Sequence, residues 1–195
     1  MPLAITLILF ATVYRVIAVS NPGLVNFSPL MALAFCGAVY FRSRWLWAVP
    51  FAALSLSDLY LNHYYATQLG YTWDLTGAIV RTACFASALG LGAIVARHKN
   101  WLNLFSGALG GAVVFYLATN TATWAVDAYY AKTPAGWWQA LTVGHLEFAP
   151  TLLFFRNTFV SDLLFTGVFA LTMEYAALRA GRPSLLGHAK AHARA

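Results

Sequence analysis

The chain has 195 residues, of which 61% are hydrophobic and only 9% are charged. A soluble domain of ordinary composition is about 45–50% apolar and about 25% charged, so these values argue against a soluble globular protein and exclude a disordered or collagen-like chain. The formal net charge is +6. Most basic residues stand between or after apolar runs, not in clusters with aromatic residues, so we expect no nucleic acid as a partner. The composition indicates an integral membrane protein whose first partner is the lipid bilayer.

Six apolar stretches approach the length of about 20 residues that a helix needs to cross the hydrocarbon core of a membrane. In chain order they are 3–19, 23–41, 45–61, 75–96, 101–125 and 159–178. Because Pro29 lacks a backbone donor, we expect the second helix to be short or broken at its first end. The sequence therefore predicts an all-α, polytopic transmembrane helix bundle of six spans, which forms a single domain over residues 1–182.

The basic residues predict the orientation of these spans. Eight of the twelve Lys and Arg residues fall on one side of the six-span arrangement: Arg42, Arg44, Arg97, Lys99, Arg179, Arg182, Lys190 and Arg194. The positive-inside rule places that side in the cytoplasm, so both termini are expected there. Residues 183–195 are expected to form a basic, disordered cytoplasmic tail.

The segment 134–155 allows two interpretations. It is long enough for a seventh span, although it contains several polar or helix-breaking residues: Gly136, Gly144, His145, Glu147 and Pro150. A seventh span would also place the basic tail outside. We therefore favour an interfacial helix in this last outer connection, anchored by Trp137 and Trp138.

Four ionisable side chains lie in the outer halves of the predicted spans: Arg15, Asp58, Arg81 and Asp162. A charge within a bilayer costs about 2.5–3.5 kcal/mol on insertion scales, and it marks a functional site by default. Because two are basic and two are acidic, they could neutralise one another and only lock the helices together. They could also form a polar cavity, rimmed by aromatic residues and facing outward, that binds a small molecule. The sequence leaves both interpretations open.

Helical spacing adds companions to these charges. Asn62 and Tyr65 share a helix face with Asp58, and Asn120 shares one with Trp124. The connection 62–73 adds further aromatic residues. The predicted ligand-binding residues are thus Arg15, Asp58, Asn62, Tyr65, Arg81, Asn120, Trp124 and Asp162.

One pairing among these charges is expected more than the others. Arg81 lies deepest, so leaving it unpaired should be the most costly. Asp58 is its expected partner, because the third and fourth spans are joined by a short connection and should be adjacent. Arg15 would then pair with Asp162 or remain available for a carboxylate of the ligand.

Catalysis has no support in the sequence. The motifs HExxH, GxSxG and SxxK and a glycine-rich phosphate loop are all absent, so we expect no enzyme. His63, His98 and His145 lie in different connections, and neither cysteine has a partner at metal-binding spacing. We therefore expect no metal and no cofactor. Without a nucleotide-binding motif, any active transport would need an energising partner.

Several stretches carry a resemblance: NFSPLMALAFCGAVYF (26–41), LSLSDLYLN (54–62), and TNTATW (119–124) followed by FFRNTFVSDLLFT (154–166). In this order they resemble an uncharacterised family of small bacterial inner-membrane proteins. Members of that family look like the substrate-binding S components of energy-coupling-factor vitamin transporters.

The resemblance implies a six-helix bundle in the bacterial inner membrane that captures a small polar or vitamin-like solute for a transporter. It also implies a coupling or energising membrane subunit as a partner. In S components an AxxxA surface on the first helix meets that subunit. Here Ala11 and Arg15 stand at that spacing, and Ala34–Ala38 in the second span is the nearest substitute. The alternative is a non-catalytic structural or accessory subunit of a larger membrane complex.

Overall fold

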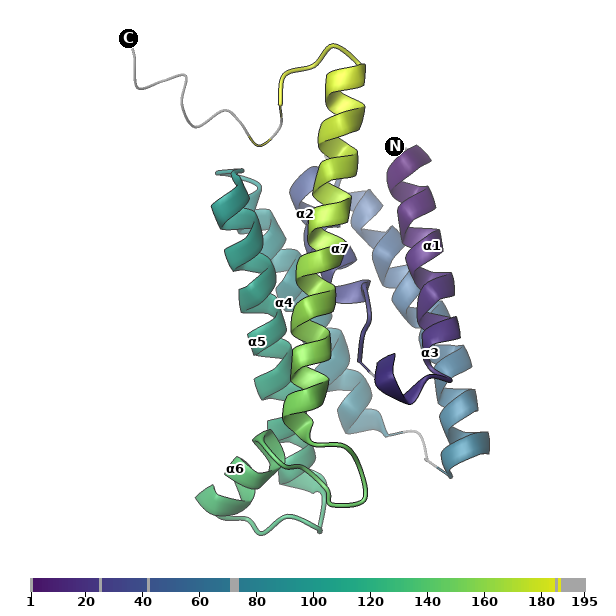
Figure 1. The fold of residues 1–195 in the computed structure, drawn as a ribbon, viewed down its shortest axis with the longest axis vertical. Helices are drawn as coiled ribbons and strands as arrows, with labels where there is room; N and C mark the ends of the chain where they lie inside the picture. The colour runs from purple at the N-terminus through teal and green to yellow at the C-terminus, as the bar shows by residue number, and fades with distance from the viewer. Residues whose placement is uncertain (1, 25, 42, 71–73, 185, 187–195) are drawn as a thin grey trace.

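The computed structural model describes residues 2–24, 26–41, 43–70, 74–184 and 186. Within these residues the protein is entirely helical, which confirms the predicted all-α class. The helices are α1 (Pro2–Ala18), η1 (Pro22–Leu24), α2 (Leu30–Tyr40), η2 (Arg44–Trp47), α3 (Ala48–Leu69), α4 (Leu75–Val95), α5 (Trp101–Val126), α6 (Pro134–Leu141) and α7 (Thr151–Arg179), where η marks a 3-10 helix. The first residues of α1 and the last residues of α7 lie at one end of the bundle, and α6 lies at the other (Figure 1).

Three of the helices, α4, α5 and α7, are long and apolar enough to cross a membrane, and α1 and α2 are shorter apolar helices. Large apolar side chains also remain exposed on the outside of the bundle, among them Leu9, Phe10, Leu102, Leu164 and Leu171. An apolar surface of this extent marks contact with lipid or another apolar partner. Together these features indicate a membrane protein.

The helix α2 lies at the centre of the bundle, and nine of its eleven residues are buried. It begins directly after Pro29, which confirms the prediction that this helix is short at its first end. Its length is about 16 Å at 1.5 Å per residue, so it cannot by itself cross about 30 Å of hydrocarbon. The described residues before it, 20–24 and 26–29, form turns, irregular backbone and the short helix η1.

Close packing joins α2 to α4. A Cβ atom on Gly92 would overlap the carbonyl oxygen of Phe35 and lie 2.8 Å from the Cβ of Ala38. Ala38 is buried at this contact, and Ala34 is buried as well. The pair Ala34–Ala38 therefore packs inside the bundle and is not available as a surface for a coupling subunit.

The expected adjacency of the third and fourth spans holds only for a few side chains: the rings of Phe51 on α3 and Phe85 on α4 lie 5.8 Å apart, and Asp58 on α3 faces Arg81 on α4 at 3.8 Å. The helix α3 packs chiefly against α1, whereas α4 packs against α2 and α5. Because α2 is apolar on every side, it takes the central place beside α4. The helix α3 also continues to Leu69 and ends at Gly70, whose φ of 67° is left-handed. Asn62 and Tyr65 thus belong to a helix, and residues 71–73 of the expected aromatic rim lie outside the described residues.

The boundaries near the C-terminus also differ from expectation. The helix α7 begins at Thr151, well before the expected start at residue 159, and polar residues of its first turns, Thr151, Asn157 and Thr158, are buried within the protein. The helix α6 has only eight residues and is too short to span a membrane. Trp138 is exposed, but Trp137 donates a hydrogen bond from Nε1 to Oγ1 of Thr121, 2.9 Å away. Trp137 therefore anchors α6 to α5.

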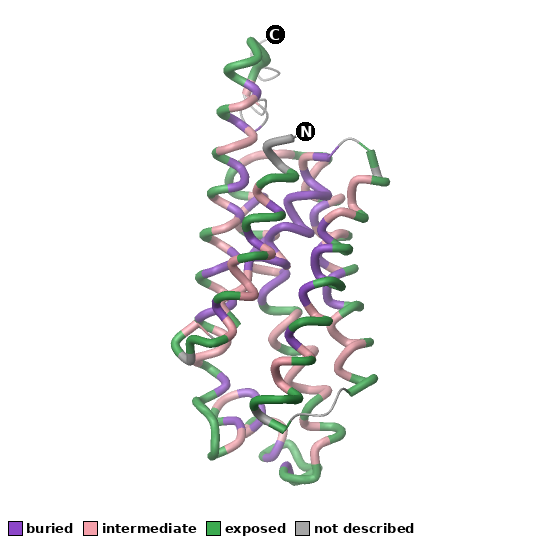
Figure 2. Tube along the Cα trace, turned by 90° about the vertical axis from the view of Figure 1, so that its right-hand side faces the viewer, coloured by how far each residue is buried: buried purple, intermediate pink, exposed green. Residues whose placement is uncertain are grey.

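The chain after α7 turns back onto the bundle. The Ser184 hydroxyl donates to Oε2 of Glu174 over 2.7 Å, and Leu186 is buried in the hydrophobic core. Ser184 and Leu186 thus contact the bundle, whereas residues 185 and 187–195 lie outside the described residues, so the disorder of the tail as a whole stays a prediction. Figure 2 shows that buried residues gather in the half of the bundle that holds the described ends of α1 and α7, whereas the half near α6 is more exposed.

Candidate functional site

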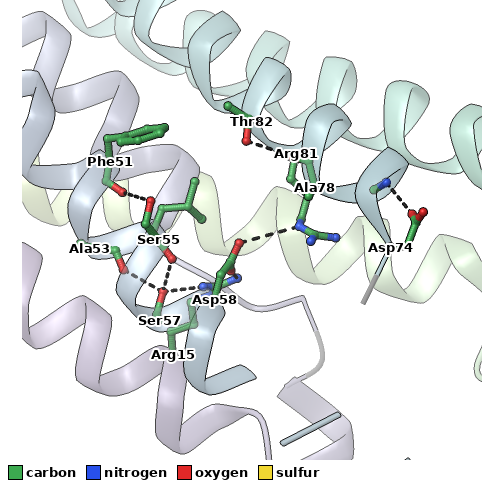
Figure 3. Close-up of polar contacts among 12 residues, drawn as sticks. Arg15, Phe51, Ala53, Ser55, Ser57, Asp58, Asp74, Ala78, Arg81 and Thr82 are labelled. Atoms are coloured by element: carbon green, nitrogen blue, oxygen red, sulfur yellow. Dashed lines mark hydrogen bonds and ion pairs between the residues drawn. The ribbon is translucent and has the colours of Figure 1, made fainter. Parts of the chain in front are cut away.

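Asp58 joins two arginines from different helices (Figure 3). Its Oδ1 lies 2.6 Å from Nη2 of Arg15 on α1, and its Oδ2 lies 3.8 Å from Nε of Arg81 on α4. Arg15 also donates from Nη1 to the hydroxyl of the adjacent Ser57 over 2.5 Å. The expected pairing of Asp58 with Arg81 is therefore present, but Arg15 makes the closer contact with the same carboxylate.

The two arginines differ in burial and in the number of polar groups that engage them. Only 17% of the Arg15 side chain is exposed, against 36% of that of Arg81. Within the described residues the Nη groups of Arg81 make no hydrogen bond. The expectation that Arg15 stays available for a ligand is therefore wrong, because Asp58 and Ser57 already engage it. Of these two arginines, Arg81 is the one whose Nη groups remain able to donate hydrogen bonds.

A cavity of about 290 Å³ lies beside Arg81, between the first turns of α4 and α7 and the last turns of α5. These turns lie toward the end of the bundle that carries α6. The lining residues are Asn26, Asp74, Thr76, Gly77, Val80, Arg81, Phe115, Tyr116, Thr119, Asn120, Ala122, Thr123, Val126, Phe154, Phe155 and Thr158. The cavity therefore combines one arginine and one aspartate with several hydroxyl groups and an aromatic wall.

Gly77 separates the two charged groups of this cavity. The Asp74 carboxylate caps α4 by accepting from the backbone N–H of Thr76 over 3.0 Å and of Gly77 over 2.5 Å. A Cβ atom on Gly77 would lie 2.7 Å from Oδ2 of Asp74 and 3.2 Å from Nη1 of Arg81. The missing side chain therefore leaves room for the guanidinium group above the first turn of the helix.

The structure brings together only part of the predicted site. Arg81 and Asn120 line the cavity, and Arg15 and Asp58 adjoin it through Arg81. The other four predicted residues neither line the cavity nor form an ion pair with Arg81: Asn62, Tyr65, Trp124 and Asp162. The indole of Trp124, for example, donates to the carbonyl oxygen of Ala131 over 2.9 Å.

Asp162, on α7, lies away from the cavity, where α7 packs against the start of α2. Its side chain is buried, with 2% exposed, and lies beside the backbone N–H of Ala32. Neither carboxylate oxygen makes a hydrogen bond of ordinary geometry within the described residues. Because the N-cap residue Pro29 offers no side-chain acceptor, Asp162 places its oxygens where α2 presents free N–H groups. Asp162 therefore joins α7 to α2.

Three further polar residues of α7 hold the irregular segment before α2. Asn157 donates to the carbonyl oxygen of Gly23 over 3.2 Å and Ser161 to that of Ser28 over 3.2 Å. The Thr158 hydroxyl has its nearer acceptor in its own helix, the carbonyl oxygen of Phe154 at 3.1 Å, and also lies 3.4 Å from the carbonyl oxygen of Asn26. Irregular backbone at membrane depth is tolerated only when such partners satisfy it.

Sequence reasoning missed most of the cavity wall. Tyr116 on α5 and Phe155 on α7 have ring centroids 4.4 Å apart, and Thr119 and Thr123 stand one turn apart beside Asn120. The signal that could have found them is the motif TNTATW, whose polar residues recur at helical spacing within an apolar stretch. The described residues contain no group of three His, Cys, Asp or Glu side chains placed to hold a metal ion.

Fold and site together define an all-helical protein of the membrane type, with a charged, aromatic-walled cavity at one end of the bundle. The model of a family described as a family of unknown function (DUF6580) matches residues 1–185. The chain belongs to this family. No curated protein matches the chain, and no solved structure matches it. The expected likeness to transporter S components stays a prediction.

Proposed function

We propose that this protein is an integral membrane protein that binds a small polar solute in the cavity between α4, α5 and α7. The observation that carries the proposal is the Arg81 guanidinium, which lines this cavity while its Nη groups make no hydrogen bond within the described residues. Charged donors at such a position are costly unless a partner engages them. At about 290 Å³, the cavity is at the lower end of the size range of small-molecule pockets.

The proposed topology has six crossings, with both termini in the cytoplasm of a bacterial inner membrane. Five are made by α1, α3, α4, α5 and α7, and the remaining one by the short helix α2 together with the chain that precedes it. The common end of α1 and α7 supports it (Figure 1). The basic residues Arg97, Arg179 and Arg182 belong to that same side in the six-crossing arrangement. In this arrangement the cavity faces outward, as a substrate-capture subunit of a transporter requires.

The alternative function is a structural subunit of a larger membrane complex, in which the charges serve only as locks. The contacts support a division of roles among the predicted residues. Arg15, Asp58 and Asp162 are engaged within the bundle, whereas Arg81 and Asn120 face the cavity. A coupling subunit remains part of the proposal, although its docking surface would differ from the buried pair Ala34–Ala38.

The test is ligand binding by purified protein in nanodiscs, screened by thermal shift against vitamins, nucleobases and amino acids. A ligand at 100 times its Kd should stabilise the folded state by about 2.7 kcal/mol. Ala122→Phe should fill the cavity and remove this stabilisation, because Ala122 lines it. Ala125→Phe is the matched control, because Ala125 is exposed on the same helix. A wild-type protein that no compound stabilises, or stabilisation that survives Ala122→Phe, would favour the structural alternative.

A further inference from the structure

Hydrogen-bond donors and acceptors are unevenly distributed along the wall of the cavity. Four lining hydroxyl groups donate their proton to a main-chain carbonyl: Tyr116 to Leu141, Thr119 to Phe115, Thr123 to Thr119, and Thr158 to Phe154. A hydroxyl group has one proton and two acceptor lone pairs. Since the proton of each group is already used, these hydroxyls offer the cavity only an acceptor.

Asn120 extends the same pattern. Its Nδ2 donates to the carbonyl oxygen of Tyr116 over 2.8 Å, and its Oδ1 accepts no hydrogen bond within the described residues. The carboxylate of Asp74 also lies in the lining and can only accept when it is ionised. Arg81 is the one cationic donor in the described lining. The Thr76 hydroxyl and the second amide proton of Asn120 are the neutral donors that remain in the described lining, so the wall presents more acceptors than donors and has one cationic donor, the guanidinium of Arg81.

The charges around the cavity already balance. Arg15 and Arg81 carry two positive charges, and Asp58 and Asp74 carry two negative ones, so these groups sum to zero. An additional net charge would have no counter-ion in a setting where an uncompensated charge is costly. A solute that is neutral overall is therefore favoured over a net anion or a net cation.

We infer that the solute is a zwitterion of amino-acid size. This inference rests on the proposed function and gives its site a substrate class. The anionic oxygen atoms of the solute accept hydrogen bonds from Arg81, and its ammonium group donates to the acceptor wall around Asn120 and Thr119. Its apolar group lies against the ring pair of Tyr116 and Phe155. The cavity volume of about 290 Å³ suits a solute of this size.

The first test compares ligands. The twenty common amino acids are titrated into the wild-type protein in nanodiscs at pH 7, and the tightest binder is compared with its deaminated and decarboxylated analogues. For phenylalanine these analogues are 3-phenylpropionate and phenethylamine. We expect the zwitterion to bind at least about tenfold more tightly than either analogue, because each analogue loses a charge-assisted hydrogen bond.

Two variants test which atoms recognise the two ends of the solute. Arg81→Gln should weaken binding of the zwitterion by at least about tenfold and leave binding of the amine analogue nearly unchanged. Thr119→Val should weaken binding of the zwitterion several-fold and spare the carboxylate analogue. Arg97→Gln and Thr82→Val are the matched controls, because both residues are exposed outside the cavity and Thr82 makes the same kind of bond within its own helix.

Several results would overturn the inference. Binding by none of the amino acids would do so, as would an analogue that binds as tightly as its parent. Equal losses in Thr119→Val and Thr82→Val would also contradict it, and this comparison holds even if Arg81→Gln does not fold. A vitamin or nucleobase that binds the wild type and is lost in Ala122→Phe would leave the proposed function standing while the zwitterion inference fails.

Discussion

At the scale of single residues, Asp58 determines how the charges of the bundle are balanced. It accepts from Arg15 at 2.6 Å and faces Arg81 at 3.8 Å. An acidic residue between two arginines stabilises both, and its removal leaves two like charges close together. The shorter distance and the lower exposure of Arg15 indicate that most of this stabilisation comes from the contact between Asp58 and Arg15.

Asp58→Asn should therefore lower the free energy of unfolding by about 1–3 kcal/mol, a range below that of a fully buried pair because all three side chains keep some solvent access. Adding Arg15→Gln should recover more of this loss than adding Arg81→Gln. Reversible unfolding in mixed micelles would measure both double-mutant cycles. Equal coupling energies in the two cycles would contradict the unequal geometry.

At the scale of helices, the contact between α2 and α4 depends on glycine at one position. Gly92 has no room for a side chain, because a Cβ atom there would overlap the backbone of α2 at Phe35. Gly90, on the same helix, has no atom within 4 Å of the equivalent position. The two glycines therefore separate the effect of packing from that of helix propensity.

Gly92→Ala should destabilise the protein by about 1–3 kcal/mol through overpacking. Gly90→Ala should instead raise stability by as much as about 1 kcal/mol, because alanine is the better helix former. Thermal unfolding of the two variants in the same detergent would compare them directly. If both substitutions raised the midpoint, α2 and α4 would not be in close contact.

The partners of the polar residues on α7 could not be predicted from the sequence. Asp162 could be recognised from the sequence as a charge inside a span, but its neighbours Asn157 and Ser161 could not be assigned a role. Their hydrogen-bond partners lie in the segment 23–28, more than 130 positions away along the chain. Helical periodicity indicates which residues share a face, but it does not indicate which distant backbone that face will contact.

At the scale of the whole molecule, the proposed topology of six crossings makes a prediction about sidedness. In a variant without Cys36 and Cys84, a cysteine at position 68 should react with an impermeant maleimide from the outside. A cysteine at position 180 should react only after the membrane is permeabilised. Gln68 and Ala180 are both exposed, and the helices α3 and α7 place them at opposite ends of the bundle (Figure 1). Labelling of both sites from the same side would rule out six crossings.

The sequence alone determined the class of this protein and part of its local structure. A chain that is 61% hydrophobic and 9% charged lacks the polar surface that water requires, so its all-helical, membrane-type architecture follows from composition and backbone hydrogen bonding. The short α2 follows from Pro29 in the same way, because proline acts on the backbone beside it.

Only the tertiary structure decided which charges meet. Asp58 contacts Arg15 as well as Arg81, and Asp162 contacts neither, because α1, α3 and α4 converge on one point while α7 faces the start of α2. The cavity likewise depends on how three helix ends pack together, and only two of its lining residues, Arg81 and Asn120, could be predicted from the sequence. Spacing along a helix is a local property, whereas the pairing of side chains depends on how whole helices pack, and α2 fixes that packing from the centre of the bundle.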